Sequence, residues 1–142
     1  MSEQLVVFSI NEEEYALPVN RVREITKLNS ITPLPDCPSY IKGILNLRGK
    51  AIPVFDIHRR LGLRRSHCPL ALIAEVDGTM LGLAVNSVKE VSVLDNLQPP
   101  PPMVTTPFIS GIINIPGRII MLLKLESLIG DEEQIMLGKI AG

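Results

Sequence analysis

Two histidines and two cysteines are the side chains in this sequence best suited to bind a metal ion. A structural zinc site usually takes four such ligands, arranged in pairs separated by about two to five residues. Cys37, His58, His67 and Cys68 contain no pair with this spacing, since His67 and Cys68 are adjacent. The sequence therefore predicts two surface histidines and two incidental thiols, and no metal site.

The segment Gly43–Lys50 has some features of a phosphate-binding loop. In such a loop, four residues separate two glycines, and a Lys and a Ser or Thr follow the second glycine. Here five residues separate Gly43 from Gly49, and Ala51 stands where the magnesium-binding hydroxyl is needed. The spacing and the missing hydroxyl therefore argue against nucleotide binding at this segment.

No other group of reactive side chains forms a recognisable catalytic pattern. The chain has no Gly-x-Ser-x-Gly nucleophile motif, and Glu24 and Asp56 form no obvious acid pair with each other or with a histidine. Scattered carboxylates usually belong to a solvated surface. We therefore expect a protein that is not an enzyme and that uses no cofactor. The alternative is an enzyme or a small-ligand barrel. Purified protein that turned over a nucleotide, or that bound stoichiometric metal, would support this alternative.

The composition indicates a single globular domain of 142 residues that is 46% apolar and 20% charged. The net charge is −1, and the longest basic runs are the pairs Arg59–Arg60 and Arg64–Arg65. A nucleic-acid-binding protein normally has a larger basic footprint. Aromatic residues are scarce and Trp is absent, so the core must consist mainly of Ile, Leu and Val, which favours β-structure.

Nothing in the sequence indicates export or insertion into a membrane. Met1–Gln4 leads directly into a predicted strand, without a basic region or a cleavage site. No apolar stretch approaches the roughly 20 residues that span a bilayer. Two cysteines make no secreted disulfide framework. We therefore expect a cytoplasmic protein with reduced thiols.

The chain contains an internal repeat. Tyr15–Ile25 aligns with Leu81–Val91 at an offset of 66 residues, and Asn20 aligns with Asn86. Gly43–Gly62 aligns with Gly111–Gly130 at an offset of 68. The two-residue difference falls in the proline-rich stretch from Gln98 to Pro102. Two copies are too few for a solenoid, so the repeat predicts two similar half-domains packed on each other.

Each half shows short apolar runs that alternate with turns rich in Gly and Pro, a pattern typical of an all-β barrel or sandwich. A proline run at Pro99–Pro102 either connects the halves or binds an aromatic groove on a partner. We expect Asn20–Ile25 to form a helical or irregular turn and Ser39–Lys42 to form one helical turn. Strands are expected at 5–10, 15–19, 28–34, 44–47, 51–55, 71–76 and 80–85, short helices at 56–61 and 126–129, and related strands in the second half.

Some residues allow two interpretations from sequence alone. Val22 and Ile25, and their equivalents Val88 and Val91, either pack in the core or form an exposed apolar groove that a partner could bind. Arg48 interrupts an apolar stretch, and it is either a solvated turn residue or an interface arginine. Its equivalent in the second half is Pro116, so the turn itself does not require an arginine.

The segment Ile41–Ile57 closely resembles the signature of CheW-like chemotaxis coupling domains. That signature is a pair of apolar residues around a Gly, then Asn-Leu-Arg-Gly, then an apolar strand with a Pro and a closing Asp. Val22-Arg23-Glu24-Ile25 and Gly82–Val91 resemble two further segments of the family, and the resemblance extends from about Glu3 to Ile129. Asn86 and Lys124 depart from the family. Members of the family often have Asp at the position of Asn86, and Asp or Asn is common near the last strand, where this chain has Lys124.

The resemblance implies an all-β fold of two intertwined five-stranded SH3-like barrels, related by the internal pseudo-twofold repeat and accompanied by short helices. It implies a single domain over residues 1–142. The half-barrels would cover about 14–68 and 69–130, with an exchanged N-terminal hairpin and a C-terminal helix at about 131–140. A fused receiver domain would need about a hundred further residues, so we expect a stand-alone coupling protein.

The resemblance also implies an adaptor without catalytic activity, which links methyl-accepting chemoreceptors to the histidine kinase CheA. Its partners would be the cytoplasmic tips of the receptors and the regulatory domain of the kinase. The free protein would be a monomer in the cytoplasm, recruited to receptor arrays at the inner face of the membrane, and it would contact the membrane only through receptors. The alternative is an adaptor of a non-chemotaxis pathway, such as pilus motility or control of a cyclase.

Transferred to this sequence, the family's two binding surfaces involve eleven residues. The residues assigned to the receptor follow the first predicted hairpin or lie at the equivalent positions of the second copy of the repeat. The residues assigned to the kinase lie before and within the Asn-Leu-Arg-Gly turn. The receptor-binding residues are Val22, Glu24, Ile25, Val85, Val88 and Val91, and the kinase-binding residues are Tyr40, Ile41, Gly43, Asn46 and Arg48.

Overall fold

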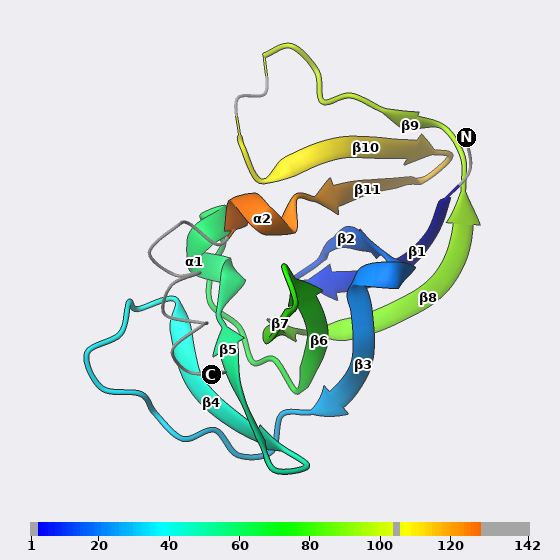
Figure 1. The fold of residues 1–142 in the computed structure, drawn as a ribbon. Helices are drawn as coiled ribbons and strands as arrows, with labels where there is room; N and C mark the ends of the chain where they lie inside the picture. The colour runs from blue at the N-terminus through cyan, green and yellow to red at the C-terminus, as the bar shows by residue number, and fades with distance from the viewer. Residues whose placement is uncertain (1–2, 104–105, 129–142) are drawn as a thin grey trace.

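Two β-sheets stack on each other, and two short helices lie at one side of the stack (Figure 1). The structure is a computed structural model that describes residues 3–103 and 106–128, the side chain of Arg59 excepted. The sheet that we call the first barrel has the strand order β3-β6-β7-β5-β4. Its strands are β3 (Val22–Lys27), β4 (Ile41–Leu47), β5 (Lys50–Phe55), β6 (Leu70–Val76) and β7 (Thr79–Val85).

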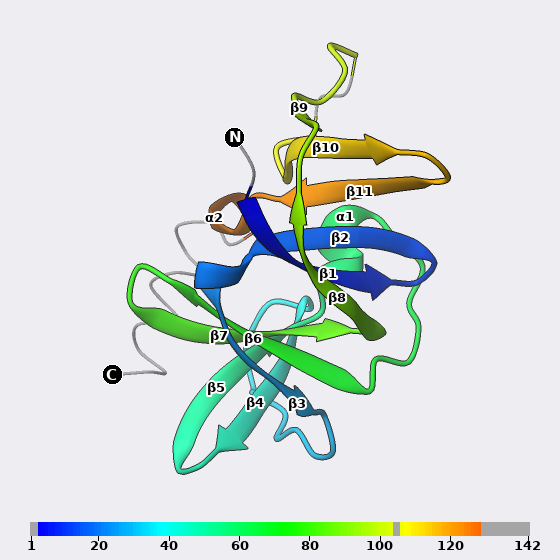
Figure 2. The same ribbon diagram turned by 90° about the vertical axis from the view of Figure 1, so that its right-hand side faces the viewer.

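The other sheet, the second barrel, has the order β8-β1-β2-β11-β10-β9. Figure 2 shows its strands in the upper part of the molecule and those of the first barrel in the lower part. The short segments are the 3-10 helix η1 (Val19–Arg21), α1 (Ile57–Leu61) and α2 (Leu125–Leu128). The strands are β1 (Glu3–Ile10), β2 (Glu13–Pro18), β8 (Ser87–Leu94), β9 (Leu97–Gln98), β10 (Ile109–Ile115) and β11 (Arg118–Leu123).

Each barrel contains a hairpin that comes from the other copy of the repeat. The hairpin β1–β2 pairs with β8 and β11, whereas its equivalent β6–β7 pairs with β3 and β5. Even the register is repeated, because Leu122 lies opposite Ala16 as Val54 lies opposite Gly82. The all-β fold class is therefore confirmed. The half-barrel boundaries 14–68 and 69–130 remain a proposal.

Both barrels close at a glycine. After β3, Thr32 pairs with Ile44 of β4 through two backbone hydrogen bonds of 2.9 and 2.8 Å. A Cβ atom on Gly43 would lie 2.3 Å from the carbonyl oxygen of Thr32, and Gly43 has a φ of +150°. In the second barrel β9 makes the equivalent closure by pairing with β10, beside Gly111. The strand β9 is one more than the five strands expected for this barrel.

The main core lies between the barrels, where the two hairpins pack against each other. Side chains alternate along each hairpin, so Val6 and Phe8 enter this central core while Leu5 and Val7 fill the second barrel. In the same way, Leu72 and its alternate neighbours face the central core, and the residues between them fill the first barrel. Both faces of both hairpins are therefore buried, which explains their almost continuous apolar sequence.

Three local predictions were wrong, each because tertiary contacts decide the local structure. Only Val19–Arg21 is helical, and Val22–Lys27 forms β3 because it pairs with β6. The expected strand at 28–34 contributes only the bridge at Thr32, since Pro33 has no N–H and cannot extend the ladder. The expected helical turn at 39–42 is a turn in which the Ile41 N–H donates to the Pro38 carbonyl, and β4 follows at once.

The remaining predictions had different outcomes. The short helix α1 ends at Leu61, and Gly62 follows it with a φ of +70°, as the sequence indicated. Pro99–Pro102 follows β9 and belongs to the second half, so it does not connect the halves. The C-terminal helix expected at 131–140 lies outside the described residues. In the part of the chain that the structure describes, no helix is long and apolar enough to cross a membrane.

The barrel closure predicts that Gly43→Ala destabilises the protein much more than Gly111→Ala. The added methyl group at Gly43 meets backbone, and the φ is unfavourable for Ala, so we expect a loss of about 3 kcal/mol. At Gly111 the nearest atom belongs to the Leu97 side chain, at 2.7 Å, which can move, so we expect about 1 kcal/mol. Urea unfolding monitored by circular dichroism measures both changes. Equal losses would contradict the backbone-contact explanation.

Candidate binding surfaces

A buried polar cluster surrounds His58, which is 1% exposed. Its Nδ1 lies 3.0 Å from Oδ1 of Asp56, and its Nε2 lies 3.1 Å from both Asn11 Oδ1 and Ser66 Oγ. The prediction of a surface histidine was therefore wrong for His58, and Asp56 does have a histidine partner. Asp56 also accepts a hydrogen bond of 3.1 Å from the His58 backbone N–H at the start of α1, as a residue that caps a helix N-terminus does.

Asp56, His58 and Cys68 lie in a row, but the row is not arranged for catalysis. The Cys68 sulfur lies 3.8 Å from His58 Nε2, and Asn11 and Ser66 lie closer to that nitrogen. Cys68 is buried, and burial raises the pKa of its thiol, so the reactive thiolate is disfavoured. Within residues 3–103 and 106–128, no three His, Cys, Asp or Glu side chains are placed to hold a metal ion.

The residues predicted to bind a receptor lie on two edge strands, β3 and β8. Both strands lie toward the right-hand side of the molecule in Figure 1, opposite the two helices. Ile25 is 42% exposed and its repeat equivalent Val91 is 51% exposed. Val22 and Val88, also equivalent to each other, are half-buried and pack against the central core. We call Val22, Glu24, Ile25, Val88 and Val91 the β3–β8 surface.

Val85 does not belong to any exposed surface. It is 0% exposed and packs in the central core. Its neighbour Ala84 points to the other face of β7 and fills the first barrel. Both residues at the end of β7 are therefore buried. The predicted direct contact of Val85 with a receptor is corrected to a supporting role in the core.

The residues predicted to bind a kinase divide into buried and exposed ones. Ile41 is a core residue, and Gly43 is buried at the barrel closure, so neither offers a side chain to a partner. Tyr40 is half-buried, with its ring stacked on Phe55 at a centroid distance of 6.1 Å. The exposed members are Asn46 and Arg48, at the turn between β4 and β5.

The β4–β5 turn is held in one conformation by local contacts. Asn46 Oδ1 accepts a hydrogen bond of 3.0 Å from the Gly49 N–H. Arg48 has a φ of +49° and Gly49 a φ of +85°, so the turn needs left-handed backbone at two successive residues, as a tight hairpin does. We call Tyr40, Asn46 and Arg48 the β4–β5 surface.

One ion pair joins the two predicted surfaces. The Arg48 guanidinium contacts the Glu24 carboxylate on β3, with side chains that are 74% and 29% exposed. This pair spans the first and last strands in the order of the first barrel. The sequence placed Glu24 and Arg48 on separate surfaces, whereas the structure brings them together.

Sequence reasoning missed several exposed apolar side chains. Val93, two positions beyond Val91 on β8, is 62% exposed, and Ile119 on β11 is 57% exposed. The alternation of Val and polar residues along β8 was a signal for a strand with one solvated face. No comparable signal existed for Ile119, which lies in a continuous apolar run.

Comparisons with known proteins agree on one family. A family model described as CheW-like domain matches residues 4–133. A chemotaxis protein CheW from Rhizobium meliloti is 30% identical, with 92% of this chain and 90% of that protein covered. A probable chemotaxis protein CheW from Rhizobium etli is 32% identical, with coverages of 92% and 89%. The crystal structure of the scaffolding protein TtCheW from Thermoanaerobacter tengcongensis superposes with a TM-score of 0.85, at 38% identity and coverages of 94% and 96%.

The assignment of exposed and buried positions predicts opposite effects of one substitution type. Ile25→Asp should change the free energy of unfolding by less than about 1 kcal/mol, because Ile25 lies on the surface of an edge strand, where a carboxylate can reach water. Val85→Asp places an unpaired carboxylate in the central core and should cost about 4 kcal/mol or more. Thermal unfolding of the two variants measures the difference. A folded, stable Val85→Asp protein would contradict the core position.

The burial of Cys68 predicts slow alkylation of its thiol. Its raised pKa leaves less thiolate at a given pH, and the side chain is only 6% exposed. Cys37 is partly exposed and is the internal control. Treatment with iodoacetamide at pH 8, followed by mass spectrometry, should modify Cys37 at least tenfold faster. In denatured protein the two cysteines should be alkylated at equal rates. Equal rates in the native protein would contradict the protected position of Cys68.

Proposed function

Because the chain belongs to the CheW-like domain family, whose members are adaptor proteins without catalytic activity, we propose that it couples membrane chemoreceptors to a histidine kinase of the CheA type. The cytoplasmic tips of the receptors bind one surface, and the regulatory domain of the kinase binds another. The protein acts by holding these two partners together, at receptor arrays on the inner face of the membrane.

The observation that carries the receptor assignment is the duplicated, exposed apolar pair Ile25 and Val91. An exposed aliphatic side chain on one edge strand has no need of a counterpart at the equivalent position of the repeat, yet both copies have one. A receptor tip is a helical hairpin, and a stripe of apolar residues on a helix can pack against such a pair. Each buried aliphatic anchor contributes about 1.5–3 kcal/mol, enough to dominate a small interface.

The half-buried Val22 and Val88 support this surface from behind. Both pack against the central core, so the exposed pair stands on a rigid base and loses little entropy on binding. Glu24 lies between Val22 and Ile25 on β3, and its carboxylate contacts the Arg48 guanidinium. We therefore assign the receptor to the β3–β8 surface, with Val85 as a core residue beneath it.

The kinase is assigned to the β4–β5 surface. The Asn46 hydrogen bond holds the turn in advance of binding, and the exposed Arg48 guanidinium offers five donors in a fixed geometry. Arg60 lies over the Tyr40 ring at 4.6 Å, which keeps that ring against the barrel. Arg48 also contacts Glu24. A kinase that binds Arg48 therefore also changes the surroundings of Glu24 on the β3–β8 surface.

Three charge substitutions test the two assignments in one experiment. Ile25→Glu should weaken binding of a receptor signalling fragment at least tenfold, about 1.4 kcal/mol, and leave kinase binding unchanged. Arg48→Glu should do the reverse. Val93→Glu is the matched control, because it places the same charge on β8 at a more exposed position outside the assigned surface. Isothermal titration with the receptor fragment and with the kinase regulatory domain gives both affinities.

The outcomes separate the assignments from the function. If the wild-type chain binds both partners from the same genome but Ile25→Glu and Val93→Glu behave alike, the receptor surface is wrong and the adaptor function stands. If the folded wild-type chain binds neither partner at micromolar affinity, about −8 kcal/mol, the chemotaxis assignment fails. Binding to the receptor and kinase of another chemosensory pathway would then support the alternative, control of pilus motility or of a cyclase.

A further inference from the structure

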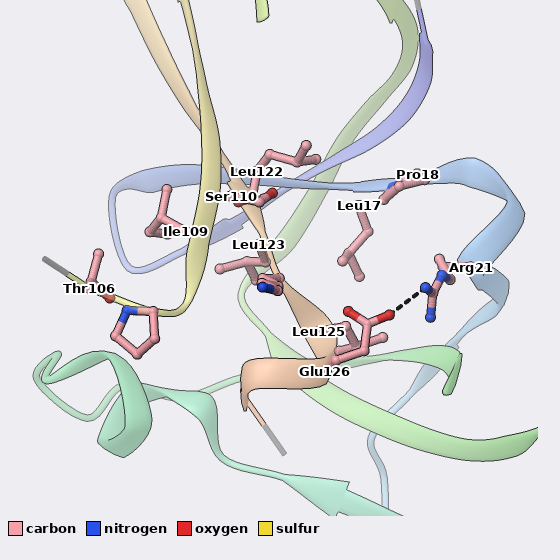
Figure 3. A pocket seen from close by; sticks show the side chains of 12 residues that line it. Leu17, Pro18, Arg21, Thr106, Ile109, Ser110, Leu122, Leu123, Leu125 and Glu126 are labelled. Atoms are coloured by element: carbon pink, nitrogen blue, oxygen red, sulfur yellow. Dashed lines mark hydrogen bonds and ion pairs between the residues drawn. The ribbon is translucent and has the colours of Figure 1, made fainter. Parts of the chain in front are cut away.

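Ion pairs hold the two edge strands, β3 and β8, in different ways. Arg21, the residue before β3, forms an ion pair with Glu126 of α2 at one end of an open groove of about 510 Å³ (Figure 3). On β3 itself, Arg23 and Glu24 each form a further ion pair. The position of β3 therefore does not depend on any single one of these contacts.

The strand β8 depends on a single arginine. Within residues 3–103 and 106–128, its one ion pair joins Glu90, the repeat equivalent of Glu24, to Arg118 of β11. Arg118 Nη2 donates at 2.6 Å to Glu90 Oε1 and at 2.6 Å to Oε1 of Glu14, a residue of β2. Arg118 Nε also donates to Glu14 Oε2 at 3.1 Å. One guanidinium therefore connects β2, β8 and β11.

These charged side chains point into one end of the second barrel. Glu90 lies opposite Val7 in the pairing of β8 with β1, and directly opposite residues point to the same face of a sheet. Val7 fills the second barrel, and so does Ile120, two positions beyond Arg118 on β11. The side chains of Arg118 and Glu90 are 34% and 35% exposed. The network therefore lies in a partly solvated site between the strands.

The register of β8 changes just before Glu90. Val88 lies opposite Phe8 of β1, whereas Glu90 lies opposite Val7. Two residues of β8 are thus used for one step along β1, and Lys89 is left without a partner in that strand. This is a β-bulge, which adds one residue to a strand and redirects the side chains that follow it.

The bulge places Val88 and Val91 on the same face of β8. In a regular strand, residues three positions apart point to opposite faces. Here Val88 lies opposite Phe8 and Val91 lies opposite Val6, and both of these β1 residues enter the central core. The half-buried Val88 and the exposed Val91 can therefore belong to one surface. Without the bulge, Val91 would lie opposite Leu5 and point into the second barrel.

Arg118 opposes this shift of register because it separates two negative charges. Hydrogen bonds from Ser92 and Arg118 lower the pKa of Glu90, so its carboxylate stays charged. Without the guanidinium, the carboxylates of Glu90 and Glu14 would repel each other in a site where charges interact more strongly than in bulk water. A shift of β8 by one residue relieves this repulsion, since it turns Glu90 out of the barrel and Val91 into it.

We propose that Arg118 is a positioning residue for receptor binding, which fixes the register of β8 and so keeps Val91 on the β3–β8 surface. The inference rests on the proposed function for the identity of the partner, whereas the register of β8 is a property of the chain alone. The part of the surface that lies on β3 has its own ion pairs and does not depend on Arg118.

NMR spectra of the full-length chain test the register directly. In Arg118→Met, nuclear Overhauser contacts between Val91 and Val6 should be replaced by contacts between Val91 and Leu5. Arg118→Lys keeps the positive charge and should keep the wild-type contacts. Arg21→Met is the matched control: it removes the ion pair of Figure 3 beside β3 and should also leave the register of β8 unchanged.

A double variant separates repulsion from a general loss of structure. Arg118→Met combined with Glu90→Gln should fold in the wild-type register, because a neutral carboxamide removes the repulsion from Glu14. This variant keeps the test decisive if Arg118→Met alone does not fold. A double variant that is unfolded, or that has the shifted register, would contradict the proposal.

Binding measurements connect the register to the receptor. Arg118→Met should weaken binding of the receptor fragment by at least about fivefold, since only the fraction of molecules in the wild-type register can bind. Binding of the kinase regulatory domain should not change, and Arg21→Met should bind both partners as the wild type does. If Arg118→Met keeps the wild-type register, or binds the receptor fragment as tightly as the wild type, the positioning role is wrong. If the wild type binds no receptor fragment but Arg118→Met shifts the register, the proposed function fails and the control of the register by Arg118 stands.

Discussion

The packing of two hairpins against each other is the constraint on which the rest of the structure depends. Each hairpin buries one face in its own barrel and the other face in the central core, and each belongs by sequence to the other half of the chain. Neither barrel can therefore form without strands from both copies of the repeat. Because buried core contacts such as those of Phe8 are worth about 3–5 kcal/mol each, the two halves fold as one unit, and β3 and β8 are left as edge strands on the same side.

Function then depends on how the two copies have diverged on this shared frame. Positions that close the barrels are alike in both halves, as Gly43 and Gly111 show. Positions on the outside differ: Arg48 with its Glu24 partner stands where the second half has Pro116, and the His58 cluster stands where the second half has Glu126 bound to Arg21. A pseudo-symmetric body with asymmetric surfaces is well suited to bind two different partners, and the exposed pair Ile25 and Val91 is the feature that both halves contribute.

The repeat and the hairpins could be predicted from the sequence because they depend on local patterns, such as apolar runs and Gly turns. The strand β3 could not, since Asn20–Ile25 has no strong strand pattern and becomes extended only by pairing with β6. Burial was harder to predict. The alternation along β8 indicates one solvated face, but no local pattern tells that Val91 lies on that face, whereas Val85 lies in the core. The cluster around His58 was missed for a related reason, since the exchanged hairpin brings Asn11 to His58 and Ser66, which lie far from it in the sequence.

The most direct test of the account is a kinase assay with membranes that contain the cognate receptor, the kinase and this chain. We expect phosphorylation of the kinase to respond to the receptor's ligand only when the chain is present. The chain alone should catalyse no phosphorylation. If receptor control of the kinase is the same with and without the folded chain, then holding the two partners together is not what this protein does.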